Sequence, residues 1–355
     1  MAAIAKPSTS QQLQQRRKQI LTRGALTMFA LLVLSVYLMP LLYGAVTSIK
    51  SKAQIADINA PLFPAEALTF EYEGKEYDIY QVPTDSGVKE WALVKKGREA
   101  SQFVDPSNPE AGPIDWEGRW RTLDRVRGFA PQWGNYREAF TKIDFLLLLR
   151  NTLAYAFITT FASVISAAIV GYGFARFDFP YKNVIFMIVI ATIVLPPQVT
   201  LVPKYAFFTY IGWTGSWWPL VVPTFFANAY NIFLMRQYFM TIPRALDEAA
   251  MIDGAGPVRI FWSINLPQAK PALVAVALFH FFFAWNDFFD PLIYLAGKPD
   301  LYPLTIGLTF FQGVFSQDQQ LIQAASFMTL IIPLIIFFLA QRFFIQGVVM
   351  TGVDK

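Results

Sequence analysis

Residues 248–267 read EAAMIDGAGPVRIFWSINLP, a partly polar stretch between two long apolar segments of the chain. Gly254 lies near its middle, and Pro267 ends it. Two short helices joined at a glycine can form a compact knob, which can sit in a groove of another protein and move as a rigid body. We therefore expect this stretch to transmit movement between the membrane part of the chain and a soluble partner.

The residues around Gly254 predict where these two helices begin and end. Pro243 suits the first turn of a helix, and Gly254 suits the residue that follows its last turn. The expected second helix runs from about residue 257 to residue 265, and Pro267 closes it because proline removes a backbone donor. The expected apolar face of the first helix consists of Leu246, Ala249, Ala250 and Ile252.

The composition identifies a polytopic membrane protein. Hydrophobic residues make up 55% of the 355 residues and charged residues 15%, whereas soluble chains carry about 25% charged residues. The lack of cysteine excludes disulfides and thiolate metal sites, and the single histidine, His280, excludes a multi-histidine metal site. A formal net charge of +4 is too small to indicate nucleic-acid binding.

Six apolar segments are each long enough to cross a hydrocarbon core of about 30 Å as a helix. They are residues 25–46, 144–174, 182–203, 217–240, 271–292 and 321–344. The first exceeds the apolar core of about 7–15 residues in a secretory signal peptide, so we expect an uncleaved span. The cluster Arg16-Arg17-Lys18 indicates a cytoplasmic N-terminus, and the basic residues of the short loops place the C-terminus on the same side.

Residues 47–143 differ in composition from the rest of the chain. Acids and bases alternate there, and proline and glycine recur. Residues 68–80 alternate apolar and polar side chains around Gly74-Lys75, which predicts a β-hairpin. We therefore expect a small, mostly β insert outside the cytoplasm, between the first and second spans; a loop longer than about 60 residues escapes the positive-inside rule.

These predictions divide the chain into five parts. They are a cytoplasmic tail (1–24), a first transmembrane helix (25–46), the extracytoplasmic insert (47–143), a five-helix core (144–346) with the loop at 241–267, and a cytoplasmic tail (347–355). Prolines within the core, at 196–197, 219, 223 and 333, can kink the helices that contain them. Two explanations for these prolines remain open: the packing geometry of the helices, and a role in gating of the transport pathway.

The spacing EAA, three residues, glycine, nine residues, Ile-x-Leu-Pro resembles the EAA loop in permease subunits of bacterial ATP-binding-cassette (ABC) importers. Further stretches resemble carbohydrate-importer permeases: RNTL at 150–153, GYGFARF at 171–177, NIFLMRQYF at 231–239 and WND at 285–287. The tail from Phe344 resembles the MalG-like permease of maltose-type systems, although it departs from the family pattern after Gly352. The resemblance covers residues 1–50 and 129–355, and residues 51–128 depart from it.

This resemblance implies an all-α polytopic membrane protein with six transmembrane helices, the type I ABC importer permease fold. It implies a loop that couples the chain to an ATPase through Glu248, Ala249, Ala250, Asp253, Gly254, Ile264, Leu266 and Pro267. Gln346 and Gly347 in the tail are expected to contact the same ATPase. For Glu248 the other interpretation is a solvated helix face.

The resemblance also implies partners and a location. The chain would pair with a second, MalF-like permease and two copies of a MalK-like ATP-binding subunit in a bacterial inner membrane. An extracytoplasmic sugar-binding protein would deliver maltose, maltodextrin or a related oligosaccharide. No phosphate-binding loop G-x-x-x-x-G-K-[ST] occurs in the chain. ATP and magnesium therefore belong to the partner, and we expect no catalytic residue, cofactor or metal here.

Polar residues within the spans are candidates for the substrate pathway, because a mid-membrane charge costs about 2.5–3.5 kcal/mol unless it faces a cavity or partner. They are Asn228, Tyr230, Asn231, Trp285, Asn286 and Asp287. An interfacial belt of aromatic and polar residues explains the same pattern. His280 is expected to be a packed histidine, because a proton relay needs further ionisable partners.

Two other functions are alternatives to ABC import of a sugar. An ion-coupled secondary transporter would carry ionisable residues inside several spans, and spans two, three and six hold few. A membrane anchor for the 47–143 region would need only one span. An importer permease for a non-sugar solute such as glycerol phosphate remains open.

Overall fold

The computed structural model describes residues 9–226, 228–313 and 318–349. The chain forms two compact units. The first, here called the β unit, comprises Met1–Asn135 with Gln319–Ala324, and the second, the helical unit, comprises Tyr136–Asp318 with Ala325–Lys355.

The β unit begins with the long helix α1 (Thr9–Ser48). Its segment Arg17–Ser48 has a mean hydropathy of 2.3 and is long and apolar enough to cross a membrane. Large apolar side chains along it are exposed, including Phe29 at 67% and Tyr37 at 77%. Such a helix needs lipid or another helix around it, because water would penalise this apolar surface. The short α2 (Lys52–Ala56) follows, with the Ser51 side chain capping its N-terminus.

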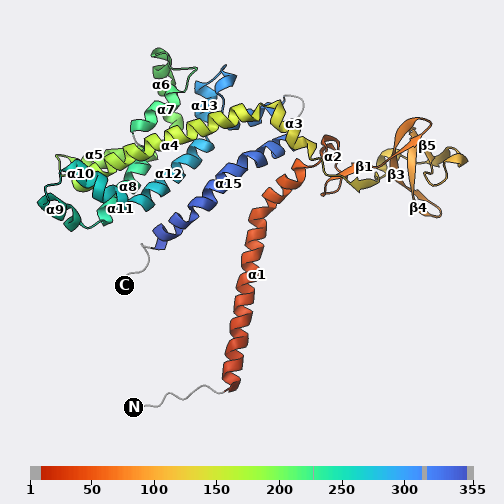
Figure 1. Ribbon diagram of the computed structural model, residues 1–355. Coiled ribbons are helices and arrows are strands. Elements are labelled where there is room, and N and C mark those ends of the chain that lie inside the picture. Colours follow the sequence, from red (N-terminus) through yellow and green to blue (C-terminus); the bar gives the residue numbers. More distant parts are fainter. Residues whose placement is uncertain (1–8, 227, 314–317, 350–355) are drawn as a thin grey trace. The chain divides into compact units, whose positions relative to one another are not determined.

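Two antiparallel sheets make up the rest of the β unit (Figure 1). Strands β2 (Thr69–Tyr72), β3 (Lys75–Thr84), β4 (Gly87–Lys95), β5 (Ala100–Val104) and β6 (Ile114–Glu117) pair in chain order. Strand β1 (Ala65–Ala67) pairs with β7 (Arg127–Phe129). The predicted hairpin is confirmed: β2 pairs with β3 through a turn in which Glu73 and Gly74 have φ of 52° and 74°. This geometry matches the right-handed twist of the strands.

Aromatic and aliphatic side chains from β3, β4 and β5 form the core of the β unit. Its buried members are Tyr80, Val82, Trp91, Leu93 and Phe103. Ile114, Trp116, Trp120 and Leu123 pack against this cluster from β6 and the following turn η2 (Trp120–Thr122). The second half of β3 alternates buried and exposed residues around Tyr80 and Val82, whereas β4 buries three consecutive residues, Trp91, Ala92 and Leu93.

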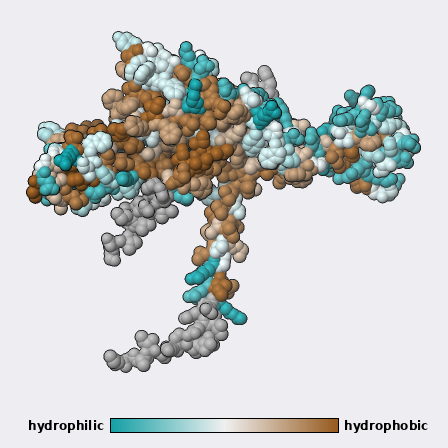
Figure 2. Space-filling model, in the orientation of Figure 1, coloured by the Kyte–Doolittle hydropathy of each residue, from teal (hydrophilic) through white to brown (hydrophobic). Residues whose placement is uncertain are grey.

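The helical unit is built around α4 (Phe145–Arg176), which packs against α8 (Ala229–Thr241) and α12 (Lys270–Trp285) (Figure 1). A Cβ added to Gly171 of α4 would lie 2.8 Å from the Met235 Cβ and 3.0 Å from the Arg236 backbone nitrogen of α8. Only glycine therefore permits this approach. Figure 2 shows apolar residues dominating the visible face of this unit over α4, α8 and α12, whereas hydrophilic residues dominate the sheets of the β unit.

The remaining elements are short or broken helices and one long helix. The short helices are α3 (Gly134–Lys142), α5 (Lys182–Ala191), α6 (Pro197–Tyr210), α7 (Trp218–Val221), α13 (Phe289–Tyr294) and α14 (Leu304–Gly307). Turns of 3-10 helix lie at Thr192–Val194, Val222–Phe226, Pro299–Leu301 and Leu308–Phe311. The long α15 (Gln319–Val349) contains Pro333 and ends the described chain.

Three helices in the described residues are long and apolar enough to span a membrane: Arg17–Ser48, Phe145–Arg176 and Gln319–Gln341. Two bent pairs, Lys182–Val194 with Val199–Tyr210 and Pro257–Gln268 with Lys270–Trp285, raise the number to as many as five. The predicted count of six is therefore not confirmed. The expected fourth span accounts for the difference: it consists of α7, which has Pro219 in its first turn, a 3-10 turn that contains Pro223, and α8.

Candidate functional site

The stretch 243–269 folds into two short helices that meet at a glycine. The first, α9, runs from Arg244 to Ile252 after Pro243. Gly254 follows it with φ of +80°, a left-handed conformation that glycine adopts without a steric cost. The Gly254 and Ala255 backbone N–H groups donate to the Met251 and Ala250 carbonyls at 3.0 and 2.9 Å. The chain thus reverses within a few residues, as the sequence predicts.

The second helix is irregular and longer than expected. It consists of α10 (Pro257–Ile260), a π-helical turn (Phe261–Asn265) and α11 (Leu266–Gln268). The expectation that Pro267 closes the second helix is wrong, because the helix continues through Pro267 to Gln268. Pro267 lies in the first turn of α11, where the N–H that proline lacks would have no partner within the helix. Beyond it, the chain bends by 77° into α12.

A buried polar cluster, here called the latch, fastens both short helices to the end of α4. The Arg176 Nε lies 3.0 Å from the Asp247 Oδ2, and their side chains are only 6% and 9% exposed. Arg176 Nη2 donates to the Asn265 Oδ1 at 3.1 Å and to the Ile242 carbonyl at 2.9 Å. Asn265 Nδ2 donates to the Asp247 Oδ1 at 2.8 Å. One side chain from each of α4, α9 and the π turn therefore closes a single network.

Aromatic rings surround the latch on its apolar side. The Tyr172 ring lies 4.9 Å from Phe261 and 5.7 Å from both Phe177 and Phe239, measured between ring centroids. Tyr172, Phe239 and Phe261 belong to the same buried cluster as Ala175 and Ile242, whereas Phe177 is 43% exposed. A charged pair inside such packing is costly to separate, because either charge would remain buried without its partner.

The opposite side of the two short helices is exposed and unusually apolar. Ile252 is 87% exposed, Val258 71%, Met251 58% and Trp262 56%. These four residues, here called the knob, come from both sides of the Gly254 turn. A compact exposed apolar surface of this kind is typical of an interaction site. The latch and the knob together make a rigid element with one anchored and one free face.

The predicted coupling residues divide between these two faces. Glu248, Ala249, Asp253, Gly254 and Pro267 are exposed, Ile264 and Leu266 are partly buried, and Ala250 is buried. The sequence patterns do not single out Asp247 or Asn265, and Arg176 occurs only as part of the motif GYGFARF at 171–177. Asp247 precedes Ala250 by three residues and shares its helix face. A charge at a buried helical position needs a partner, and that signal could have identified the latch.

The candidate pathway residues of α8 have structural roles in this structure. The Asn228 side chain caps α8 by accepting from the backbone N–H of Tyr230 at 2.9 Å. Asn231 is buried and donates to the Ser163 Oγ at 2.9 Å. Tyr230 is 44% exposed, and its ring lies 6.1 Å from that of Phe279. Asn228 and Tyr230 are thus exposed, whereas Asn231 is buried.

The candidate residues at the C-terminal end of α12 also differ in exposure. Trp285 is 3% exposed and stacks on Phe281 at 5.6 Å. Asn286 is exposed and donates to the Phe282 carbonyl, while the Tyr155 hydroxyl donates to the Asp287 Oδ2 at 2.7 Å. His280, expected to be packed, is 8% exposed. Gln346 and Gly347 lie within α15, but their side chains fall outside the part of the chain that the structure describes.

Comparison with known proteins places this geometry among transport proteins. The family model for the binding-protein-dependent transport system inner membrane component matches residues 160–347. An osmoprotective-compound uptake permease of Synechocystis, GgtD, is 31% identical over 269 residues, which covers 75% of this chain and 88% of that protein. A glycerol-3-phosphate permease of Yersinia pestis, UgpE, is 33% identical over 208 residues, covering 58% and 73%.

Two further similarities extend the comparison. The alpha-glucoside permease AglG of Rhizobium meliloti is 30% identical over 228 residues, covering 62% of this chain and 59% of that protein. A crystal structure of a bacterial ABC transporter that imports the acidic polysaccharide alginate matches 96% of this chain and 100% of its own chain. Its TM-score is 0.64 at 19% identity, so this similarity concerns the fold.

Proposed function

Because this chain belongs to the family of binding-protein-dependent transport system inner membrane components, we propose that it is the permease subunit of an ATP-driven importer whose coupling element is residues 243–268. The observation that carries this proposal is the knob, which is exposed and apolar while the latch fixes its base. A surface that must transmit force needs both properties: a free face for the motor and a rigid connection to the spans.

The proposed mechanism is alternating access. A separate ATPase closes on ATP and draws the knob toward it. The latch joins α9 and the π turn to the end of α4, so movement of the knob is transmitted to α4 and to the helices packed on it, α8 and α12. Hydrolysis then resets the element. The 77° bend at residue 269 lets the coupling element lie across the direction of α12.

The family implies an ATPase and a binding protein as partners. We propose a second permease and two ATP-binding subunits, MalF-like and MalK-like in role, and an extracytoplasmic binding protein. The proposed topology has six spans in the bacterial inner membrane, with both termini cytoplasmic and the β region at 65–129 outside. The exposed apolar side chains of α1 suit lipid or the second permease.

The proposed substrate is a sugar or a related polyhydroxylated solute. The relatives named above take up an alpha-glucoside, osmoprotective compounds or glycerol 3-phosphate, and none of their names specifies maltose. Glycerol phosphate therefore stays as the alternative within the importer class. The pathway candidates that are exposed or half-buried are Asn228, Tyr230, Asn286 and Asp287.

The test is co-purification and coupled ATP hydrolysis with the candidate ATPase. The variant Glu248→Arg with Gly254→Pro should insert normally but lose the stable complex and the substrate-stimulated ATPase activity. A Lys75→Gln variant, altered at the exposed β2–β3 turn, is the matched control and should behave as the native chain. An unchanged complex in the double variant would refute the proposed coupling element, and a proton- or sodium-gradient uptake test would follow.

A further inference from the structure

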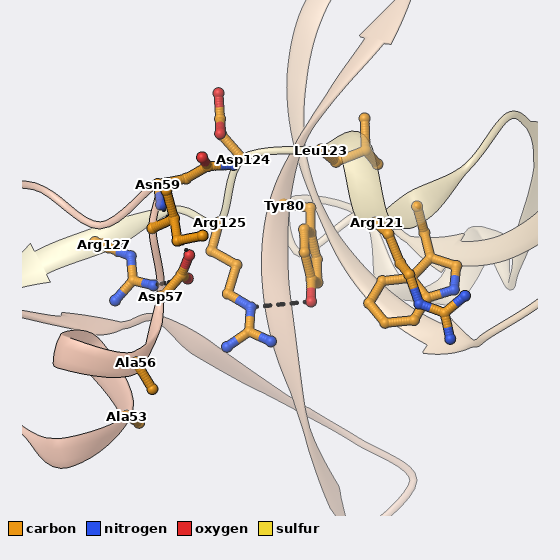
Figure 3. Close-up of a pocket in the computed structure, with 12 residues that line it drawn as sticks. Ala53, Ala56, Asp57, Asn59, Tyr80, Arg121, Leu123, Asp124, Arg125 and Arg127 are labelled. Atoms are coloured by element: carbon orange, nitrogen blue, oxygen red, sulfur yellow. Dashed lines mark hydrogen bonds and ion pairs between the residues drawn. The ribbon is translucent and has the colours of Figure 1, made fainter. Parts of the chain in front are cut away.

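Two adjoining cavities in the β unit have no part in the proposed coupling mechanism. The first, of about 610 Å³, lies between α2, strand β3 and the segment that leads into β7 (Figure 3). The second, of about 480 Å³, lies between the β4–β5 turn and η2. Trp120 and Arg121 line both cavities and thus form their common wall. Each volume falls within the range of roughly 300–1,000 Å³ that is usual for small-molecule sites.

The common wall holds cations against aromatic rings. Lys96 Nζ lies 5.3 Å and Arg121 Cζ 5.0 Å from the centroid of the Trp120 ring. The Trp120 ring meets the buried Tyr80 edge-on at 6.2 Å. Arg125 Nε donates to the Tyr80 hydroxyl at 3.1 Å, the contact drawn in Figure 3. Trp120 and Tyr80 therefore orient three cations, Lys96, Arg121 and Arg125, because cation–π and hydrogen-bond contacts fix the positions of their head groups.

The charges of the two cavities do not cancel. Their linings contain five arginines, at 98, 119, 121, 125 and 127, and three acids, Asp57, Glu99 and Asp124. Asp57 forms an ion pair with Arg127. The Arg125 Nε lies 3.7 Å from the Asp78 Oδ2, so Arg125 is also paired with an acid. Among the described residues, Arg98, Arg119 and Arg121 form no ion pair with any acid. Three guanidinium groups thus remain available at the common wall and in the second cavity.

We propose that the two cavities form one binding site for an acidic oligosaccharide, a sugar chain that carries carboxylate groups. Planar guanidinium groups bind carboxylates through two parallel hydrogen bonds. This geometry favours a carboxylate over an anion that offers a single acceptor atom. Two cavities with a common basic wall suit a ligand with repeated anionic units. Asn59 and Asp124 in the first cavity supply acceptors for sugar hydroxyls. This site goes beyond the proposed transport function, which needs only a pathway through the spans.

The test uses the full chain in its complex, in detergent and without the binding protein. Trigalacturonate and the neutral maltotriose are titrated by calorimetry into the native complex and into four variants. Arg121→Gln removes the common cation and should weaken trigalacturonate binding about tenfold or more, as expected for loss of a charge-assisted hydrogen bond. Arg121→Lys keeps the charge but loses the planar fork, so its affinity should fall in between.

Two controls separate a specific site from general charge effects. Lys75→Gln removes an exposed cation that lines neither cavity, roughly 17 Å along β3 from Tyr80, and should bind as the native complex does. Arg98→Gln should weaken binding because it lines the second cavity. Maltotriose should show no dependence on Arg121.

Three results would overturn the proposal. They are no binding of trigalacturonate by the native complex, equal affinities in all four variants, and full displacement of trigalacturonate by inorganic phosphate at matched ionic strength, which would indicate a general anion site. None of these results bears on ATP coupling. Substrate-stimulated ATPase activity in the coupling-element variants tests the proposed function separately.

Discussion

Replacing Arg176 with glutamine tests whether the latch holds the coupling element. The Arg176→Gln variant leaves the Asp247 carboxylate in a site where its side chain is 9% exposed. Removing one partner of a buried ion pair typically costs about 3–5 kcal/mol. The introduced glutamine side chain can still donate one hydrogen bond, and Asn265 still donates to Asp247 at 2.8 Å, so we expect the lower half of that range.

The double variant Arg176→Gln with Asp247→Asn sharpens this prediction. It removes both charges and keeps groups of similar shape, so no carboxylate stays buried without a partner. We expect it to be more stable than Arg176→Gln alone, with an interaction energy of about 1–3 kcal/mol in the double-mutant cycle. Arg259→Gln, which changes an exposed arginine of the same loop, should shift stability by less than about 0.5 kcal/mol.

The assay combines thermal unfolding of the purified complex with substrate-stimulated ATP hydrolysis. Arg176→Gln should lower the unfolding temperature and uncouple hydrolysis from substrate, because α9 can then move without α4. The double variant should recover stability in part. Arg176→Gln could instead unfold and hydrolyse ATP like the native complex, or the stability losses of Arg176→Gln and Asp247→Asn could simply add in the double variant. Either result would show that the latch is not a coupled network.

Three further predictions concern backbone approach, turn geometry and the exposed knob. Gly171→Val should cost about 1–3 kcal/mol by thermal unfolding, because its side chain would overlap Met235 of α8; Gly173→Ala, with no atom within 4 Å of an added Cβ, should be nearly neutral. Gly254→Ala should cost about 1–2 kcal/mol at φ +80°, whereas Gly256→Ala, at φ −74°, should not; equal losses would contradict the left-handed turn. Ile252→Glu should leave the unfolding temperature unchanged, since Ile252 is 87% exposed, yet abolish co-purification of the ATPase.

The sequence predicted the first short helix and the Gly254 turn of residues 243–268 because their signals are local. Pro243 and Gly254 punctuate helix α9, and their effects depend on backbone chemistry within a few residues. The hairpin at Gly74 was predicted for the same reason. The second helix ends at Gln268 rather than near residue 265, because the chain continues from a π turn, which no local propensity indicates, into α11 with Pro267.

The latch and the basic site were not predicted because they depend on contacts between distant residues. Arg176 and Asp247 are 71 positions apart, and only the packing of α4 against α8 brings α9 within reach of Arg176. Lys96, Trp120 and Tyr80 likewise meet only after the sheet forms. The six-span count is not confirmed at the fourth segment, because hydropathy does not register that the helix there is divided into α7 and a 3-10 turn that contains Pro223.

The most direct test of the central claim uses the lack of native cysteine in the chain. Ile252→Cys places a single reactive thiol on the knob, and Ile58→Cys, at a site that is 99% exposed in the β unit, serves as the control. With a short thiol-reactive crosslinker, we expect the residue 252 variant to link to the ATP-binding subunit, and we expect the yield of this crosslink to change when ATP is added. A link from residue 58 but not from residue 252 would contradict this expectation.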